Sequence, residues 1–291
     1  MNELLSPRLL SQLERLQLAT RRRLAGRFTG EHRSPAFGTS VDFADYREYY
    51  PGDDFRRIDY PLYARTGHLF VRLFEAEDDL TVQLVIDRSA SMGMHDKLQQ
   101  AVRMAAAIGF VALIRRDTVI VHTTPPLGPE LGPPRRFSGR HATAPLFALL
   151  ASLEAAGPTD LTGATRTVLA YGGRPGVTVV ISDLLGEDWA AAVDRVVARG
   201  GDATVLHLLA ADELRPAHIG DLEMIDVETG ADVPASLSPA ALGEYGAHVA
   251  TWLAETAGHC TRRGVTYVRV MAEDPPEDVL LRGWTRAGVL R

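Results

Sequence analysis

Residues 81–93 read TVQLVIDRSASMG, an apolar run followed by Asp87, Ser89 and Ser91 at alternating positions. A short apolar run bounded by polar residues predicts a buried strand. A carboxylate and two hydroxyls directly after such a strand suit three roles: a catalytic nucleophile, a cradle for a metal ion, or a cap on the following helix. Residues elsewhere in the chain distinguish these roles.

Strands and helices alternate downstream of this stretch. We expect strands at 68–75, 80–87, 118–122, 177–182, 203–209 and 266–271, and helices at 97–116, 144–156, 161–171, 188–199 and 240–262. Residues 125–140, rich in Pro, Gly and Arg, are expected to form a loop. Such alternation implies crossover connections and a parallel sheet covered on both faces. The predicted fold class is α/β, with a doubly wound, mostly parallel, Rossmann-type sheet.

The N-terminal part has a different character. Leucines at helical spacing between residues 4 and 18 predict an N-terminal helix that ends in Arg21–Arg23. Residues 26–66 carry many Gly, Pro, aromatic and paired charged residues, which predicts an ordered but irregular extension. We therefore expect two domains, with 1–77 holding the helix, the irregular segment and a strand, and 78–291 holding the α/β domain.

Composition excludes several classes of protein. The chain has 291 residues and a net charge of −6, which disfavours a nucleic-acid binder. Its single cysteine, Cys260, excludes an intramolecular disulfide and a multi-cysteine zinc site. The longest apolar run, Met104–Ile114, is shorter than the roughly 20 residues of a membrane span, and no secretory signal is visible. We expect a cytoplasmic protein with at most peripheral membrane contact.

Three polar groups are expected at one edge of the sheet. Asp87–Ser91 and Ser182–Asp183 each follow a predicted strand, and Gly157–Asp160 forms a loop between helices. Ligands of open α/β sheets gather at the carboxyl ends of the strands. The carboxylates and hydroxyls form an all-oxygen set, which suits Mg²⁺ or Mn²⁺ rather than zinc. Capping of the following helices is the alternative role for the first group and for the loop.

These groups resemble the metal-ion-dependent adhesion site of von Willebrand factor type A domains. That site combines an Asp-x-Ser-x-Ser motif, a Thr from a later Gly-x-Thr loop and an Asp after a following strand. The matching residues are Asp87, Ser89, Ser91, Thr159 and Asp183. Thr162 is close enough to Thr159 to compete for its role. The resemblance implies a von Willebrand factor A-like domain that binds Mg²⁺ or Mn²⁺ through these residues.

The upstream segment YREYYPGDDFRRIDY (46–60) resembles the signature of domain-of-unknown-function family 58. The matching residues are Arg47, Tyr49, Gly52, Asp53, Asp54, Arg56, Ile58 and Asp59, with Tyr60 where the family has Trp. IDVETG (225–230) is similar to the same family. The signature suits a salt-bridged turn, a partner surface, or a device that locks the N-terminal segment on the main domain. We favour the locking role.

The resemblance implies protein partners. Family members typically occur alongside ATPases of the MoxR branch of the AAA+ class and are thought to act with them in protein maturation. We therefore expect a non-enzymatic, divalent-metal-dependent module for protein interaction. Its partners would be a MoxR-type AAA+ ATPase and a client protein that carries an acidic residue, because too few negative charges surround the cation to saturate it.

An enzyme is the alternative. A haloacid-dehalogenase-like phosphotransferase would use Asp87 as nucleophile and Asp183 as metal ligand. That class places a second Asp two residues after the nucleophile, where this chain has Ser89. A serine nucleophile has less support, since no Gly-x-Ser-x-Gly elbow is present around the motif. A third interpretation is a structural domain whose site is occupied but idle.

Overall fold

The computed structural model describes residues 4–19, 43–74, 80–124, 134–170 and 176–290. Contacts divide the chain into a smaller unit, Ala25–Asp79, and a larger unit, Met1–Leu24 with Leu80–Arg291. Helix α1 (Pro7–Leu13) therefore belongs to the larger unit, whereas the sequence suggested a boundary at residue 77. The reason is hydrophobic burial, because the apolar side of α1 joins the core of the α/β unit.

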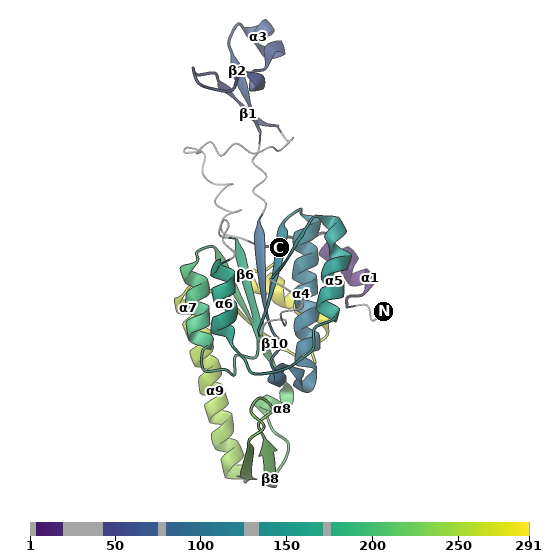
Figure 1. The fold of residues 1–291 in the computed structure, drawn as a ribbon, viewed down its shortest axis with the longest axis vertical. Helices are drawn as coiled ribbons and strands as arrows, with labels where there is room; N and C mark the ends of the chain where they lie inside the picture. The colour runs from purple at the N-terminus through teal and green to yellow at the C-terminus, as the bar shows by residue number, and fades with distance from the viewer. Residues whose placement is uncertain (1–3, 20–42, 75–79, 125–133, 171–175, 291) are drawn as a thin grey trace. The chain divides into compact units, whose positions relative to one another are not determined.

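The larger unit is built on a six-stranded sheet (Figure 1). The strands are β3 (Thr81–Asp87), β4 (Thr118–Thr124), β5 (Arg135–Ser138), β6 (Val177–Ser182), β7 (Asp202–Leu209) and β10 (Thr266–Met271). Their order across the sheet is β10-β7-β6-β3-β4-β5, and every neighbouring pair is parallel except β4 and β5. This confirms the predicted α/β class with a mostly parallel sheet.

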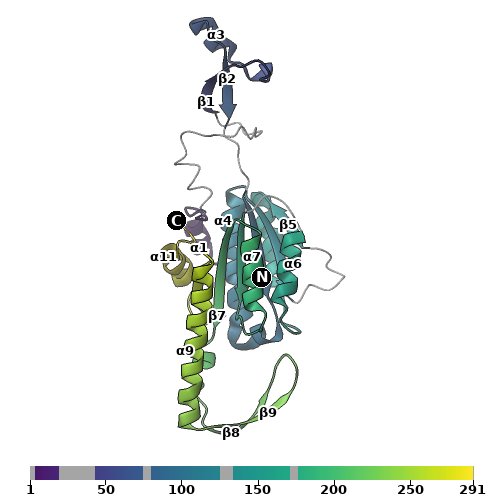
Figure 2. The ribbon, with the colours of Figure 1, turned by 90° about the vertical axis from the view of Figure 1, so that its left-hand side faces the viewer.

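Helices cover both faces of the sheet (Figures 1 and 2). On one face lie α1, α4 (Lys97–Ile114), α5 (Thr143–Ala151) and the C-terminal turns α10 (Pro276–Asp278), η5 (Val279–Gly283) and α11 (Trp284–Ala287). On the other lie α6 (Leu161–Ala170), α7 (Trp189–Ala198) and α9 (Pro239–Arg262). Leu84 joins the first core and Val85 the second, since successive strand residues face opposite sides.

A central helical segment, Ala90–Ile114, joins η2 (Ala90–Asp96) to α4. Among the described residues it is the one helix long and apolar enough to cross a membrane by length and composition. However, 78% of its most apolar window is buried inside the protein, as in the core helix of a globular domain. The cytoplasmic location stays a prediction.

Two segments are more regular than the sequence predicts. Strand β5 lies inside the expected loop 125–140, where Phe137 is its one buried side chain. The strands β8 (Gly220–Ile225) and β9 (Asp232–Leu237) pair antiparallel where no strand was expected. Both segments are mainly exposed, so neither has the apolar periodicity that marks a buried strand. Two short helical turns complete the unit, η4 (Arg140–Ala142) and α8 (Ala211–Leu214).

The smaller unit is described over residues 43–74. Strands β1 (Phe43–Glu48) and β2 (Phe70–Phe74) pair antiparallel, and between them in sequence lie η1 (Phe55–Arg57) and α3 (Tyr60–Thr66). The expected irregular extension thus contains a strand and a helix. Asp59 caps α3 by accepting the N–H of Leu62 at 2.9 Å, and Gly67 closes the helix with a φ of 72°.

Candidate functional site

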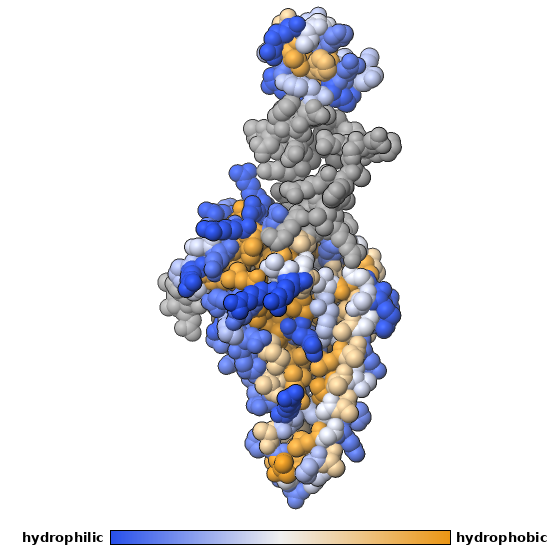
Figure 3. Space-filling view, turned by 180° about the vertical axis from the view of Figure 1, so that it is seen from behind, coloured by the Kyte–Doolittle hydropathy of each residue, from blue (hydrophilic) through white to orange (hydrophobic). Residues whose placement is uncertain are grey.

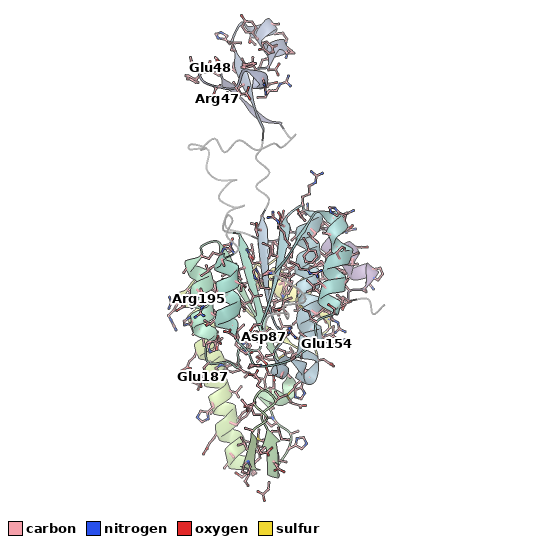
Figure 4. The ribbon with its side chains drawn as sticks, in the orientation of Figure 1. Arg47, Glu48, Asp87, Glu154, Glu187 and Arg195 are labelled. Atoms are coloured by element: carbon pink, nitrogen blue, oxygen red, sulfur yellow. The ribbon has the colours of Figure 1, made fainter. Side chains whose placement is uncertain are left out.

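Asp87 ends β3, the strand at which the chain order reverses. The next strand in sequence, β4, pairs with one edge of β3, and the later strand β6 pairs with the opposite edge. Such a reversal leaves a crevice outside the carboxyl ends of the strands, where open α/β sheets bind ligands. Thr124 ends β4 beside Asp87 in the register, and Ser182 ends β6. Figure 4 shows Asp87 at this edge of the sheet.

The Asp87 carboxylate is fully buried and bonded to neutral donors. The Ser182 hydroxyl donates to Oδ2 at 2.6 Å, the Thr159 hydroxyl donates at 3.1 Å, and the Ser89 N–H donates to Oδ1 at 2.9 Å. Among the described residues no Lys, Arg or His forms an ion pair with it. Burial raises the pKa of Asp87, an effect that the Ser182 hydrogen bond opposes and the charge of Asp183 reinforces. A cation bound here would relieve that penalty.

Ser89 and Ser91 place two more oxygens at this point. Both side chains are buried, and their hydroxyl oxygens lie 3.0 Å apart in a hydrogen bond. Ser89 occupies the N-cap position of η2, but its side chain makes no capping hydrogen bond. The capping alternative therefore does not describe what the Ser89 hydroxyl does.

Thr159, rather than Thr162, lies beside Asp87. The Thr159 hydroxyl is within 3.3 Å of both carboxylate oxygens of Asp87. The hydroxyl of Thr162 is buried and has no hydrogen-bond partner among the described residues. Asp160 accepts the N–H of Gly163 at 2.6 Å and so caps the start of α6. The loop thus places the Thr159 hydroxyl beside Asp87 and caps α6 through Asp160, and a role of Thr159 as a metal ligand stays a prediction.

Asp183 is buried after β6, but its carboxylate binds a lysine. Lys97 Nζ donates to Asp183 Oδ2 at 2.7 Å and also to Glu213 Oε1. Lys97 is the only lysine of the chain, and its side chain is 0% exposed. Burial opposes the charge of Lys97, yet the two carboxylates outweigh it and raise its pKa. Asp183 therefore adds negative charge near Asp87 while one of its oxygens is held by an ammonium group.

Three residues at the site were not predicted there: Lys97, Glu213 and Glu228. Ser182 was expected at this edge together with Asp183, but not among the metal ligands. Lys97 had a signal, as the single lysine among 31 basic residues. Glu228 Oε2 accepts the N–H of Thr159 at 3.3 Å, a contact between residues 69 positions apart. Glu213 belongs to a segment with no periodicity, and Glu228 lies in IDVETG, which the family resemblance singled out without indicating where it lies in the fold.

The signature around Asp59 holds the smaller unit together from within. Asp59 accepts hydrogen bonds from Arg72 Nε at 2.8 Å and from the Tyr46 hydroxyl at 2.8 Å. These bonds, with the N–H of Leu62, lower the pKa of Asp59 to about 2, and Arg72 has the largest effect. Asp59 therefore stays ionised over the whole physiological range.

The rest of the signature forms a salt-bridged turn. Arg47 pairs with Asp53 at 2.8 Å, and Asp54 caps η1 by accepting the N–H of Arg56 at 3.0 Å. Gly52 has a φ of 111°, a conformation that favours glycine. The N–H of Tyr49 donates to the main chain of residue 69 at 2.9 Å. The locking of this segment on the main domain stays a prediction.

The donor set at Asp87 fits a hard divalent cation. It consists of carboxylate and hydroxyl oxygens, the ligand type that Mg²⁺ and Mn²⁺ prefer. No group of three or more His, Cys, Asp and Glu that could hold a metal occurs in the described part of the chain. With two carboxylates and three hydroxyls, a cation bound here would keep water or an external oxygen among its ligands.

The chain is similar in sequence to uncharacterized bacterial proteins and in structure to two solved proteins. Uncharacterized proteins of Mycobacterium bovis and Mycobacterium tuberculosis are 28% identical to it over 265 residues, which cover 86% of this chain and 81% of theirs. Two solved structures each cover 72% of this chain and are matched over 98% of their own. They are the conserved hypothetical protein BatB from Bacteroides thetaiotaomicron (15% identity, TM-score 0.39) and an aerotolerance-related membrane protein from Bacteroides fragilis with multiple mutations to serine (19%, 0.42). The family described as "Protein of unknown function DUF58" matches residues 45–249, more than half of the sequence, and the chain therefore belongs to the DUF58 family.

Proposed function

We propose that this protein is a non-enzymatic interaction module that depends on a divalent cation, Mg²⁺ or Mn²⁺. The residues that would hold the cation are Asp87, Ser89, Ser91, Thr159 and Asp183. The observation that carries the proposal is the buried Asp87 carboxylate, which has neutral hydrogen-bond donors and no cationic partner among the described residues. A bound cation would supply the positive charge that a partner's carboxylate needs.

The order and placement of these residues support a von Willebrand factor A-like adhesion site. The Asp-x-Ser-x-Ser stretch follows the central strand, Thr159 comes from a loop beside it, and Asp183 follows the neighbouring strand. The hydroxyl of Thr159 and the carboxylate of Asp87 are already within hydrogen-bond distance. The chain's own residues thus preorganise the oxygens before any partner binds.

The proposed partners are a MoxR-type AAA+ ATPase and a client protein that presents an acidic side chain. The resemblance noted from the sequence supports these partners, because proteins similar to this chain occur alongside such ATPases. The cation would bind the acidic side chain at the coordination position that the protein leaves to an external oxygen. We place this activity in the cytoplasm, with peripheral membrane contact at most.

The phosphotransferase alternative has less support from the geometry. Both oxygens of Asp87 accept hydrogen bonds from hydroxyls or a main-chain N–H, which lowers the nucleophilicity of the carboxylate. Ser89 occupies the position of the acid/base in that class, and its N–H donates to Asp87. A hydroxyl at that position has a pKa far too high for general acid/base catalysis near neutral pH.

The test is association with a MoxR-type AAA+ ATPase from the same organism, in Mg²⁺ and in excess chelator. We expect Asp87→Ala to abolish the Mg²⁺-dependent association while circular dichroism shows an intact fold. Asp221→Ala, at an exposed position on β8, is the matched control and should bind like the wild type. Association that persists in Asp87→Ala or in chelator contradicts the proposal, and turnover of a phosphate ester that depends on Asp87 would support the phosphotransferase instead.

A further inference from the structure

One residue connects the β8–β9 hairpin to the candidate site. Residues 223–230 are exposed with one exception, Glu228, which is half-buried. Its Oε2 accepts the N–H of Thr159 at 3.3 Å, and the hydroxyl of the same Thr159 donates to Asp87. A single loop residue therefore bonds to both carboxylates. Figure 2 shows the tip of the hairpin turned back toward the lower edge of the sheet.

The turn between β8 and β9 holds Glu228 without using its side chain. Asp226 Oδ1 accepts the N–H groups of Glu228 at 2.8 Å and of Thr229 at 3.1 Å. Gly230 has a φ of 73° and donates its N–H to the Asp226 carbonyl at 2.7 Å. Asp226 and Gly230 thus account for the conformation of IDVETG. The carboxylate of Glu228 adds nothing to the turn and is directed to Thr159.

The charges around Asp87 are unbalanced. Lys97 neutralises part of the charge of Asp183 and Glu213, to which it is bonded. Asp87 and Glu228 have no cationic partner among the described residues, although both bond to Thr159. A divalent cation between these two carboxylates would balance their negative charge.

The hairpin is also easy to displace. Neither of its strands has a buried residue, and Met224, Ile225 and Val233 are about half exposed or more. Figure 3 shows hydrophobic side chains gathered over this part of the molecule. A segment with so little burial opens at a low free energy.

We propose that Glu228 is an internal ligand of the candidate cation site. It takes the coordination position that a partner's carboxylate would otherwise take, so the isolated protein closes its own site and a partner binds by displacing the turn. This inference rests on the proposed function, because it requires a cation at Asp87.

The experiment uses Mn²⁺ as the probe and the full chain. Mn²⁺ affinity is measured by electron paramagnetic resonance, and the waters on the bound ion are counted by proton relaxation. We expect Glu228→Gln to weaken Mn²⁺ binding about tenfold and to add one exchangeable water. Glu223→Gln, at an exposed position on the same hairpin, is the matched control and should behave like the wild type.

The outcomes separate this inference from the proposed function. If Asp87→Ala abolishes Mn²⁺ binding but Glu228→Gln changes neither affinity nor water count, the inference is overturned and the cation site stands. If the wild type does not bind Mn²⁺, or binds it equally well after Asp87→Ala, both are overturned. Amide hydrogen exchange gives an independent readout: Mg²⁺ should slow exchange at 226–230 in the wild type and not in Glu228→Gln.

Discussion

Lys97 Nζ lies 2.7 Å from Asp183 Oδ2, and neither side chain is more than 2% exposed. A buried ion pair of this kind contributes little net stability compared with apolar residues, but removal of one partner leaves the other charged and unpaired. The pair also fixes the Asp183 carboxylate at the end of β6, next to Asp87. Lys97 is therefore a positioning residue for the candidate site.

Replacement of this lysine should be strongly destabilising. Lys97→Met leaves the buried carboxylate of Asp183 without its counter-ion, and we expect the free energy of unfolding to fall by about 3 kcal/mol. Urea denaturation measures the change. The double variant Lys97→Met/Asp183→Asn should regain part of the loss, because it removes the unpaired charge. If Lys97→Met alone were as stable as the wild type, the ion pair of Lys97 and Asp183 would not stabilise this edge of the sheet.

Gly186 tests the site without altering a proposed ligand. A Cβ at this position would lie 2.6 Å from Cγ2 of Thr159, closer than side chains tolerate. Gly186→Ala should push the Thr159 hydroxyl away from Asp87 and weaken Mg²⁺ binding about tenfold, or ~1.4 kcal/mol, in calorimetric titration.

The control for this substitution is Gly243→Ala in α9, where a Cβ meets no atom within 4 Å. It should leave Mg²⁺ binding unchanged and stabilise the helix by about 0.5–1 kcal/mol. Equal affinities for Gly186→Ala and the wild type would contradict the role assigned to Thr159.

Because His122 is buried, we expect the folded protein to lose free energy of unfolding in mild acid. The Nδ1 of His122 lies 2.9 Å from the Thr167 hydroxyl, and its Nε2 lies 2.6 Å from the side-chain amide of Gln83. The Gln83 amide is oriented so that its nitrogen donates to His122 Nε2 and its oxygen accepts from the Arg199 guanidinium. Burial, with a smaller effect of the Arg199 charge, lowers the pKa of His122 to about 4. The ring is therefore neutral in the folded protein.

The sign of the pH effect follows from this depressed pKa. Between about pH 6.5 and pH 4 the unfolded chain binds a proton that the folded His122 does not. The folded protein is therefore more stable above pH 6.5 than at pH 4 by about 3 kcal/mol, and this difference is lost as the pH falls from 6.5 toward 4. Nitrogen-15 spectra of the imidazole give its pKa directly. A His122 that titrates near 6.5 would contradict this prediction.

Asp87 should show a conflict between stability and binding. Burial raises the pKa of Asp87, so without a cation the charged form of Asp87 is less favourable in the folded protein than in the unfolded chain. In chelator, Asp87→Asn should therefore melt at the same temperature as the wild type or higher. In Mg²⁺ the melting temperature of the wild type should rise and that of Asp87→Asn should not. A variant that melts lower in chelator would show that the carboxylate serves structure instead.

The sequence predicts those parts of the fold that depend on continuous burial. The run ending at Asp87 lies in a strand buried on both faces, and such a run is readable without knowledge of its neighbours. The ends of β3 and β6 then predict that Asp87 and Asp183 lie at one edge of the sheet. Thr159 is predicted from its loop, and the structure places its hydroxyl beside Asp87.

Other features depend on contacts between distant segments and leave little trace in the sequence. Lys97 and Glu213 are 116 positions apart, and their contact requires the path of the chain from α4 to α8. Strand β2 was predicted within residues 1–77, but its antiparallel partner β1 was not predicted. The hairpin that carries Glu228 is exposed on nearly all sides, so hydrophobic patterning cannot reveal it.

The most direct test of a cation site at Asp87 is a calorimetric titration of Mg²⁺ into the full chain and into Asp87→Asn. We expect one saturable site in the wild type and none in the variant, because the Asp87 carboxylate provides the charge at the centre of the oxygen set. Binding of equal affinity to both proteins, or no binding to the wild type, would contradict this expectation.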